Sequence, residues 1–203
     1  MTLLEVLLGV LLLSLIGMLA FSLVTGARQA FERQSDWAAR VKPATEAVDA
    51  LILDLAGSLI PGQGEAPYFR LASGAEGSEL SLVTTAPPTE DGVPLSRFRV
   101  LRVAWHLEKD AAGRPGLVRE ARPELASGEV KTERFRLEGV TALTILVYDA
   151  GKKEWVPGWT TGRGGALPPA ARVEVKVATS RGAETVRQDA VIPAGLLIGA
   201  PGR

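Results

Sequence analysis

The chain has 203 residues and a mass of 21.5 kDa, which suits one domain with an appendage. Its 23 basic and 23 acidic residues give a formal net charge of zero, so charge offers no case for nucleic-acid binding. The absence of cysteine excludes disulfides, thiolate metal sites and cysteine nucleophiles, and the single histidine, His106, excludes sites built on two histidines.

The N-terminal segment has no charged side chain between Val6 and Ala27 and consists mainly of large apolar residues. A helix of this length spans about 33 Å, against a hydrocarbon core of about 30 Å. We therefore predict a transmembrane helix over residues 1–27 and a separate domain over residues 28–203. A cleaved secretory signal and a plain signal anchor both call for a basic flank before the apolar run, but the first basic residue is Arg28. A third interpretation is that the chain begins at a processing point from which a basic leader was removed.

Glu5 is the one acidic residue at the start of this helix. A carboxylate inside a membrane helix costs a few kcal/mol, that is about 2.5 to 3.5, and tends to be functional. The residues from Thr2 to Glu5 also fit a capping box, in which the two side chains satisfy backbone donors at the helix start. Both explanations can apply, with Thr2 as the helix cap, but capping alone does not explain why a basic flank is missing.

The residues MTLLEVLLGVLLLSLIGMLAFSLV resemble the mature N-terminus of type IV pilins and type II secretion pseudopilins. The pattern is an apolar first residue, then Thr-Leu-Leu/Ile-Glu, then an uninterrupted apolar helix; the usual first residue is Phe, where this chain has Met1. The resemblance implies that a prepilin peptidase cuts before Met1 and methylates its amine. It also implies that Glu5 pairs with the N-terminal amine of a neighbouring subunit during assembly.

Beyond Arg28 the helical pattern becomes amphipathic, with an apolar stripe and mostly polar other faces. The stripe is formed by Phe31, Trp37, Val41, Val48, Ile52, Leu55 and Leu59, and the polar faces by residues such as Arg33, Asp36, Arg40, Glu46, Asp49 and Asp54. We predict one helix over roughly residues 2–59, with a kink or short break near residues 41–44 because Pro43 lacks an N–H. Trp37 and Val41 are predicted to contact a partner subunit.

The rest of the chain alternates between apolar and polar residues, punctuated by Gly, Pro and Asp, which predicts β-strands. The predicted strands are 68–73, 79–85, 97–108, 117–122, 133–137, 142–148, 172–179 and 184–192. Because no helix lies between consecutive strands, the sheets should be mainly antiparallel. The predicted fold class is α+β: a long N-terminal helix, half in the membrane and half amphipathic, packed on antiparallel sheets.

Three stretches of the β-region carry a narrower resemblance. The segments RFRVLRVAWHLEKD and GLVREARP, and the later run FRLEGVTALTILVYDAGKKEWVPGWTTGRGGALPPAARVEVKV, are similar to the J-type minor pseudopilin of type II secretion. The first two segments resemble paired strands of that family. Within the later run the matching residues are Glu138-Gly139-Val140, Asp149, Trp155, Trp159 and Leu167-Pro168. The resemblance implies a subunit that meets I-type and K-type minor pseudopilins and the major pseudopilin at the tip of a periplasmic fibre, and that starts in the inner membrane.

Chemistry in the sequence is sparse. No nucleophile, phosphate-binding or zinc-protease motif is present, and a lone His106 in an alternating strand is more typical of a sheet residue than of a catalytic base. The acidic loops at residues 89–92 and 149–154 offer fewer oxygen ligands than the six to eight that Ca²⁺ takes. We predict no catalytic residue, no metal, no cofactor and no small-molecule substrate. A minor pilin of a type IV pilus or DNA-uptake system, which would share the N-terminus, remains the alternative function.

Overall fold

The computed structural model describes most of the chain in two compact units, Met1–Ala39 and Arg40–Arg203. The described residues are 3–61, 67–74, 76–85, 89–90, 93–94, 100–124, 132–162, 165–179 and 182–198. The division predicted from hydropathy, after residue 27, marks where charged residues begin. The boundary between the compact units lies further along the helical region, where the chain begins to pack against the sheets.

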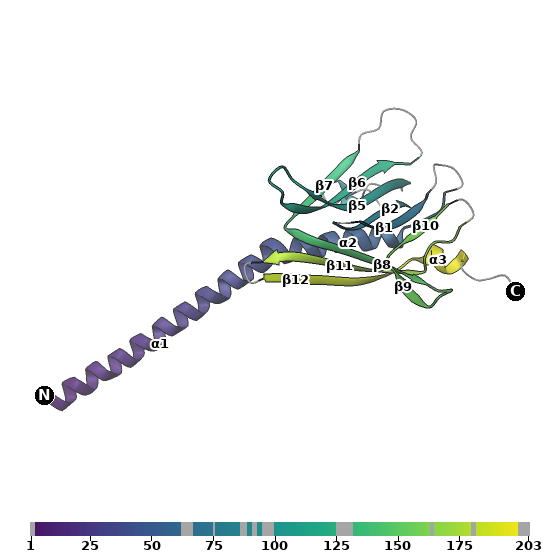
Figure 1. The fold of residues 1–203 in the computed structure, drawn as a ribbon. Coiled ribbons are helices and arrows are strands. Elements are labelled where there is room, and N and C mark those ends of the chain that lie inside the picture. The colour runs from purple at the N-terminus through teal and green to yellow at the C-terminus, as the bar shows by residue number, and fades with distance from the viewer. Residues whose placement is uncertain are drawn as a thin grey trace. The chain divides into compact units, whose positions relative to one another are not determined.

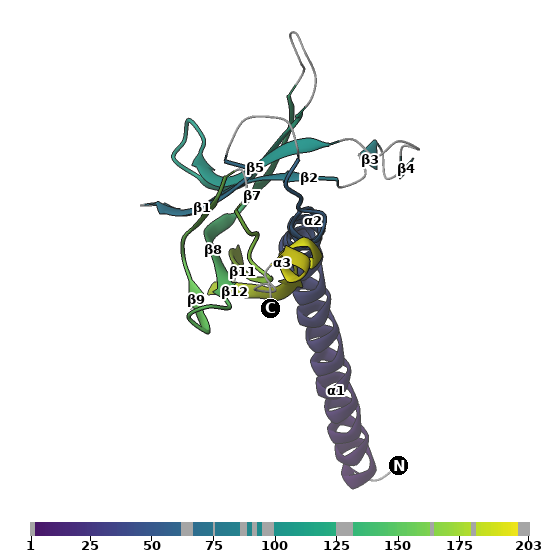
Figure 2. The same ribbon diagram turned by 90° about the vertical axis from the view of Figure 1, so that its right-hand side faces the viewer.

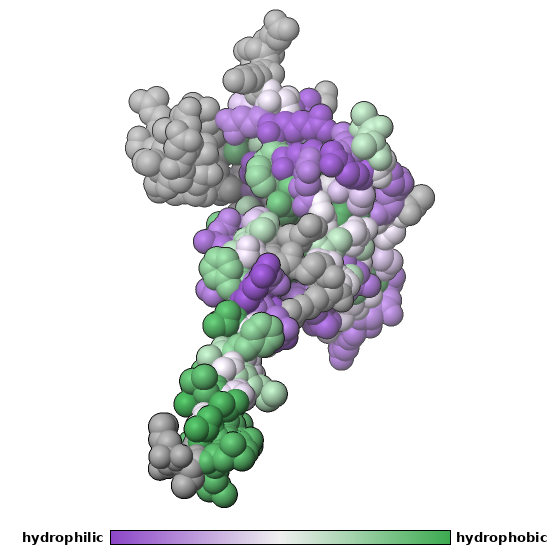
Figure 3. Space-filling view, turned by 90° about the vertical axis from the view of Figure 1, so that its left-hand side faces the viewer, coloured by the Kyte–Doolittle hydropathy of each residue, from purple (hydrophilic) through white to green (hydrophobic). Residues whose placement is uncertain are grey.

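The first unit is dominated by α1, an α-helix over Leu3–Asp36 (Figure 1). Its large apolar side chains are exposed along the whole length of the apolar run, from Leu3 at 82% to Val24 at 67%, and Figure 3 shows the helix surface as mainly hydrophobic. The hydroxyls of Ser14 and Thr25 donate to the carbonyls of Val10 and Phe21, four residues earlier, so neither needs a water partner. The helix is long and apolar enough to cross a membrane.

A π-helical segment, η1 over Trp37–Val41, joins α1 to the second α-helix, α2 over Lys42–Ala56. Pro43 lies in the first turn of α2, where its missing N–H costs least. The predicted irregularity is therefore a π-helical segment just before the proline, and the helical backbone continues through it without a break. The helical region ends at Ala56, earlier than the predicted residue 59, because Ser58 forms a β-bridge with Thr84 and the Leu59 N–H donates to the Val83 carbonyl at 3.0 Å.

The second unit contains two antiparallel sheets and a short hairpin (Figure 2). The six-stranded sheet has the order β10 (Trp159–Thr161), β1 (Phe69–Gly74), β2 (Gly77–Thr84), β5 (Leu101–Lys109), β6 (Pro115–Pro123), β7 (Glu133–Glu138). The four-stranded sheet has the order β12 (Gly182–Val191), β11 (Ala170–Thr179), β8 (Val140–Asp149), β9 (Glu154–Val156). The hairpin pairs β3 (Thr89–Glu90) with β4 (Val93–Pro94), and a short helix, α3 (Pro193–Ile198), follows β12.

The predicted α+β class and antiparallel sheets are confirmed, and each of the eight predicted strands overlaps an observed one. The sequence did not predict β3, β4, β9, β10 or α3. Each of these strands has two or three residues and α3 has six, which is too short for a period of alternation to be recognised.

The core of the second unit lies between α2 and the two sheets, since α2 contacts strands of both. Leu51 and Leu55 of α2 are fully buried in it. The sheets come close at the start of β2, where Gly77 has φ +141° and a Cβ atom would lie 2.9 Å from the Leu143 carbonyl oxygen. Next to it, the Ser78 hydroxyl accepts a hydrogen bond of 2.8 Å from the Ile145 N–H of β8. Only glycine fits this contact between the sheets.

Candidate functional site

The N-terminal residues predicted for processing and assembly lie at the start of α1. Met1 and Thr2 are outside the described residues, so the predicted methylation and capping positions stay predictions. Glu5 has a helical backbone in the first turns of α1, and its side chain is outside the description. The helix beyond it offers apolar side chains with exposed fractions of about half or more, such as Leu7 at 64% and Leu11 at 64%.

The predicted partner-contact residues lie at the junction of the two units and differ in exposure. Trp37 is 52% exposed and begins the π-helical segment. Val41 ends that segment and is 7% exposed, so its side chain belongs to the core of the second unit instead of an open surface. A tryptophan with a half-open ring is a common anchor of protein interfaces, and the prediction of a partner contact here therefore rests on Trp37.

A buried polar cluster fastens α2 to the six-stranded sheet. The Asp54 side chain is 1% exposed and receives two hydrogen bonds from Arg119, at 2.8 Å from Nε and 3.0 Å from Nη2. The Trp105 Nε1–H donates to the same carboxylate at 2.9 Å, and the Arg119 guanidinium lies 5.9 Å from the centroid of the Trp105 ring. The charge and the indole N–H are thus satisfied inside the protein, and the helix is held to β5 and β6 together.

The assignment of Asp54 to a solvent-facing helix surface was wrong. Asp54 follows Leu51 by three residues and Ala47 by seven, so it lies on the buried face of α2, and burial becomes tolerable because β6 supplies a guanidinium. The helical spacing was the signal available in the sequence. The partner of Asp54 could not be found in the same way, because Arg119 lies 65 residues further along the chain, with β1 to β5 in between.

A second cluster covers the outer face of the four-stranded sheet. The Trp155 ring of β9 packs edge-on against the Tyr148 ring of β8, with 5.5 Å between ring centroids. The Arg172 guanidinium of β11 lies 4.4 Å from the centroid of the Trp155 ring. Arg172 also makes two hydrogen bonds of 2.8 Å to Asp189 of β12. The cluster therefore connects all four strands of this sheet through side chains.

The contribution of the Arg172–Asp189 ion pair to the stability of the folded state should decrease as the pH falls. Hydrogen bonds from Arg172 lower the pKa of Asp189 below its ordinary 3.8, so the ionised pair stabilises the folded state above that pH and its contribution is lost as pH falls toward the lowered pKa. The gap in melting temperature between the wild type and an Asp189→Asn variant should therefore narrow as pH falls from 6 to below 3.8. A gap that stays constant over this range would contradict the ion pair.

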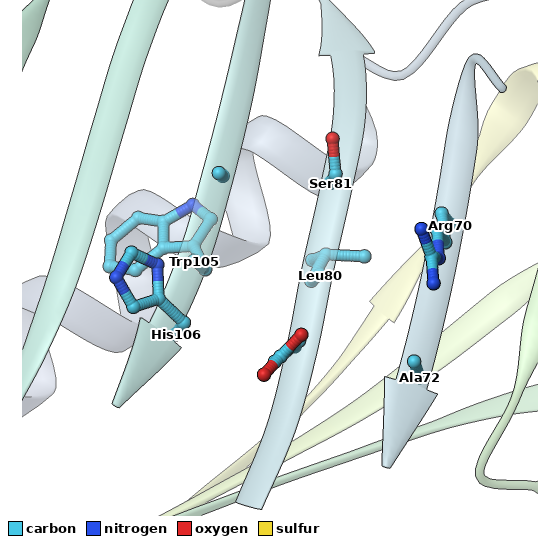
Figure 4. Close-up of a pocket in the computed structure, with 8 residues that line it drawn as sticks. Arg70, Ala72, Leu80, Ser81, Trp105 and His106 are labelled. Atoms are coloured by element: carbon cyan, nitrogen blue, oxygen red, sulfur yellow. The ribbon is translucent and has the colours of Figure 1, made fainter. Parts of the chain in front are cut away.

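A solvent-open hollow of about 320 Å³ lies over β1, β2 and β5 of the six-stranded sheet (Figure 4). Figure 4 shows Arg70 of β1, Ser81 of β2 and His106 of β5 around it. His106 Nε2 is 3.6 Å from the Glu108 carboxylate, and within the described residues His106 makes no hydrogen bond to the Ser81 hydroxyl. Within the described ranges, no group of three or more histidine, aspartate or glutamate side chains is placed to hold a metal ion.

A long exposed apolar helix followed by a second helix packed on antiparallel sheets defines a pilin-like protein, and the part of the chain that the structure describes has one candidate membrane span. The family model described as "Type II secretion system (T2SS), protein J" matches residues 20–188, and the chain belongs to this family. A comparison with curated proteins found no match. The family implies a minor pseudopilin of the type II secretion system, which is a structural component and not a class of enzymes. The apolar helix and the family together fit a single-pass membrane anchor.

Proposed function

We propose that this chain is a minor pseudopilin that assembles at the tip of the pseudopilus and helps to initiate the fibre that moves proteins across the outer membrane. The observation that carries the proposal is the family match over residues 20–188, which favours secretion over the alternative of a type IV pilus or DNA-uptake minor pilin. The partners under this proposal are the I-type and K-type minor pseudopilins, the major pseudopilin and the prepilin peptidase.

The proposed location is the inner membrane, with a single span and the second unit in the periplasm. An apolar helix such as α1 can be held in the membrane by lipid contacts and later exchange them for contacts with neighbouring helices. Its exposed apolar side chains suit both environments, so assembly needs no refolding of the helix. Trp37 is proposed to contact a neighbouring subunit beyond the membrane span, where its ring is half exposed.

Glu5 is proposed to pair with the N-terminal amine of a neighbouring subunit, and Met1 to be the processed and methylated end of the chain. In a bilayer a carboxylate and an ammonium attract over longer distances than in water, because the local dielectric constant is low. Thr2 is proposed to cap the helix in the same place. These two roles of the N-terminal residues can be separated, because pairing needs the charge of Glu5 and capping needs only an acceptor.

Replacing Glu5 by glutamine is expected to impair assembly while leaving membrane insertion and the second unit intact. Glutamine keeps most of the capping hydrogen bonds but removes the charge. The measurement is cross-linking of the full chain into the tip complex, together with secretion of exported proteins. Glu5→Leu serves as the companion variant and should insert at least as well as the wild type, since a carboxylate opposes partition into hydrocarbon. Wild-type cross-linking and secretion by Glu5→Gln would refute the pairing role.

A further inference from the structure

Two exposed apolar side chains flank the buried Asp54–Arg119 pair. Leu53, the residue before Asp54 in α2, is 61% exposed, and Phe135 of β7 is 50% exposed. Phe135 is the ladder partner of Arg119, so the two side chains lie on the same face of the sheet. Arg119 reaches Asp54 at 2.8 Å and α2 contacts β7, so the helix that carries Leu53 lies beside the edge strand that carries Phe135.

Acidic side chains surround these two apolar residues. Glu46 and Asp49 precede Leu53 by seven and four residues, which places all three on one exposed face of α2. Glu133 is exposed on β7, two residues before Phe135 and on the same side of the strand. Within the described part of the chain, Asp49 and Glu133 have no oppositely charged partner, and Glu46 has only Lys42 at 4.0 Å. The acidic docking surface is defined here as Glu46, Asp49, Leu53, Glu133 and Phe135.

The chemistry of this surface specifies its partner. Apolar side chains of this size gain by leaving water, while the carboxylates around them favour a basic rim on whatever covers them. The two acidic residues of α2 in this surface, Glu46 and Asp49, lie within one helical turn, about 4.5 Å apart along its axis. A helix lying beside α2 can present basic residues at that same spacing together with an apolar side chain toward Leu53 and Phe135.

We propose that the acidic docking surface binds an amphipathic helix of a neighbouring secretion subunit, with an apolar stripe bordered by lysine or arginine. The inference rests on the proposed function for the identity of the neighbour, and it adds which face of the chain is used and what chemistry the neighbour presents there. Docking also removes water from the Arg119 side chain, which is 22% exposed, and so strengthens its attraction to Asp54.

The test is photo-cross-linking from single positions of the full chain in secreting cells. A photoreactive phenylalanine analogue at position 53 or 135 is expected to capture one and the same protein. Position 191 is the matched control, because Val191 on β12 is 60% exposed and lies outside the surface. Capture of different proteins from 53 and 135, capture of lipid only, or equal capture of the same protein from 191 would overturn the proposal.

Two substitutions in the surface and one control outside it test the contact without requiring that folding or secretion be lost. With the cross-linker at position 135, Leu53→Asp and Asp49→Lys should each reduce capture several-fold, whereas Val191→Asp should leave it unchanged; all three positions are exposed, so the fold tolerates the change. Undiminished capture in both surface variants would overturn the proposal. If the wild-type chain supports secretion but these variants capture normally, the docking surface is wrong and the proposed function stands; if the wild-type chain does not support secretion, the proposed function is wrong.

Discussion

Replacing Leu55 by aspartate is expected to unfold the second unit. Leu55 is fully buried in the core between α2 and the sheets, and an unpaired carboxylate there costs several kcal/mol, comparable with the roughly 5 to 15 kcal/mol by which a domain is stable. Fluorescence of the buried Trp105 and limited proteolysis of the full chain in detergent measure the loss.

Leu53→Asp is the matched control, since it makes the same chemical change two residues away on a side chain that is 61% exposed. Leu53→Asp should leave the free energy of unfolding within about 0.5 kcal/mol of the wild-type value. Similar transitions for both aspartate variants would mean that the buried face of α2 is assigned wrongly.

Replacing Arg119 of the buried cluster by methionine is expected to destabilise the second unit nearly as much as Leu55→Asp does. Arg119→Met leaves the Asp54 carboxylate, 1% exposed, with only the Trp105 indole as donor. Breaking a buried pair from one side costs on the order of 3 to 5 kcal/mol, because the remaining charge stays desolvated. Chemical denaturation of the full chain in detergent, followed by tryptophan fluorescence, measures the change.

The double variant Asp54→Leu/Arg119→Met should recover most of that loss, since it removes both charges and keeps the side-chain volume. A remaining deficit of about 1 to 3 kcal/mol is expected, because the Trp105 N–H loses its acceptor. Arg172→Met provides a surface comparison, because Arg172 makes the same two-bond contact with Asp189 in the open, and its effect should be much smaller. Equal losses from Arg119→Met and Arg172→Met would show that the Asp54 pair is not structurally important.

The sequence was informative where a pattern extends over many residues. The apolar run of α1 was predicted from its composition, and the helical stripe that includes Val48 and Leu55 from its period. The structure buries both Val48 and Leu55. Such patterns are readable because each one follows from the geometry of its own element.

The features that sequence reasoning missed depend on contacts between distant elements. Asp54 was assigned to solvent because a single aspartate carries no sign that Arg119 and Trp105 will meet it. The three-residue strands β9 and β10 exist because neighbouring strands pair with them, as Trp155 does with Tyr148. Phe135 was predicted to lie in a strand, but its exposure follows from the position of β7 at the sheet edge.

The central claim, that this chain acts by assembly as a minor pseudopilin, is tested most directly in a strain that lacks its gene. Full-length wild-type chain should restore secretion of exported proteins and should copurify from membranes with the I-type and K-type pseudopilins. Secretion that is normal without the gene, or restored secretion with neither pseudopilin copurifying, would contradict the account.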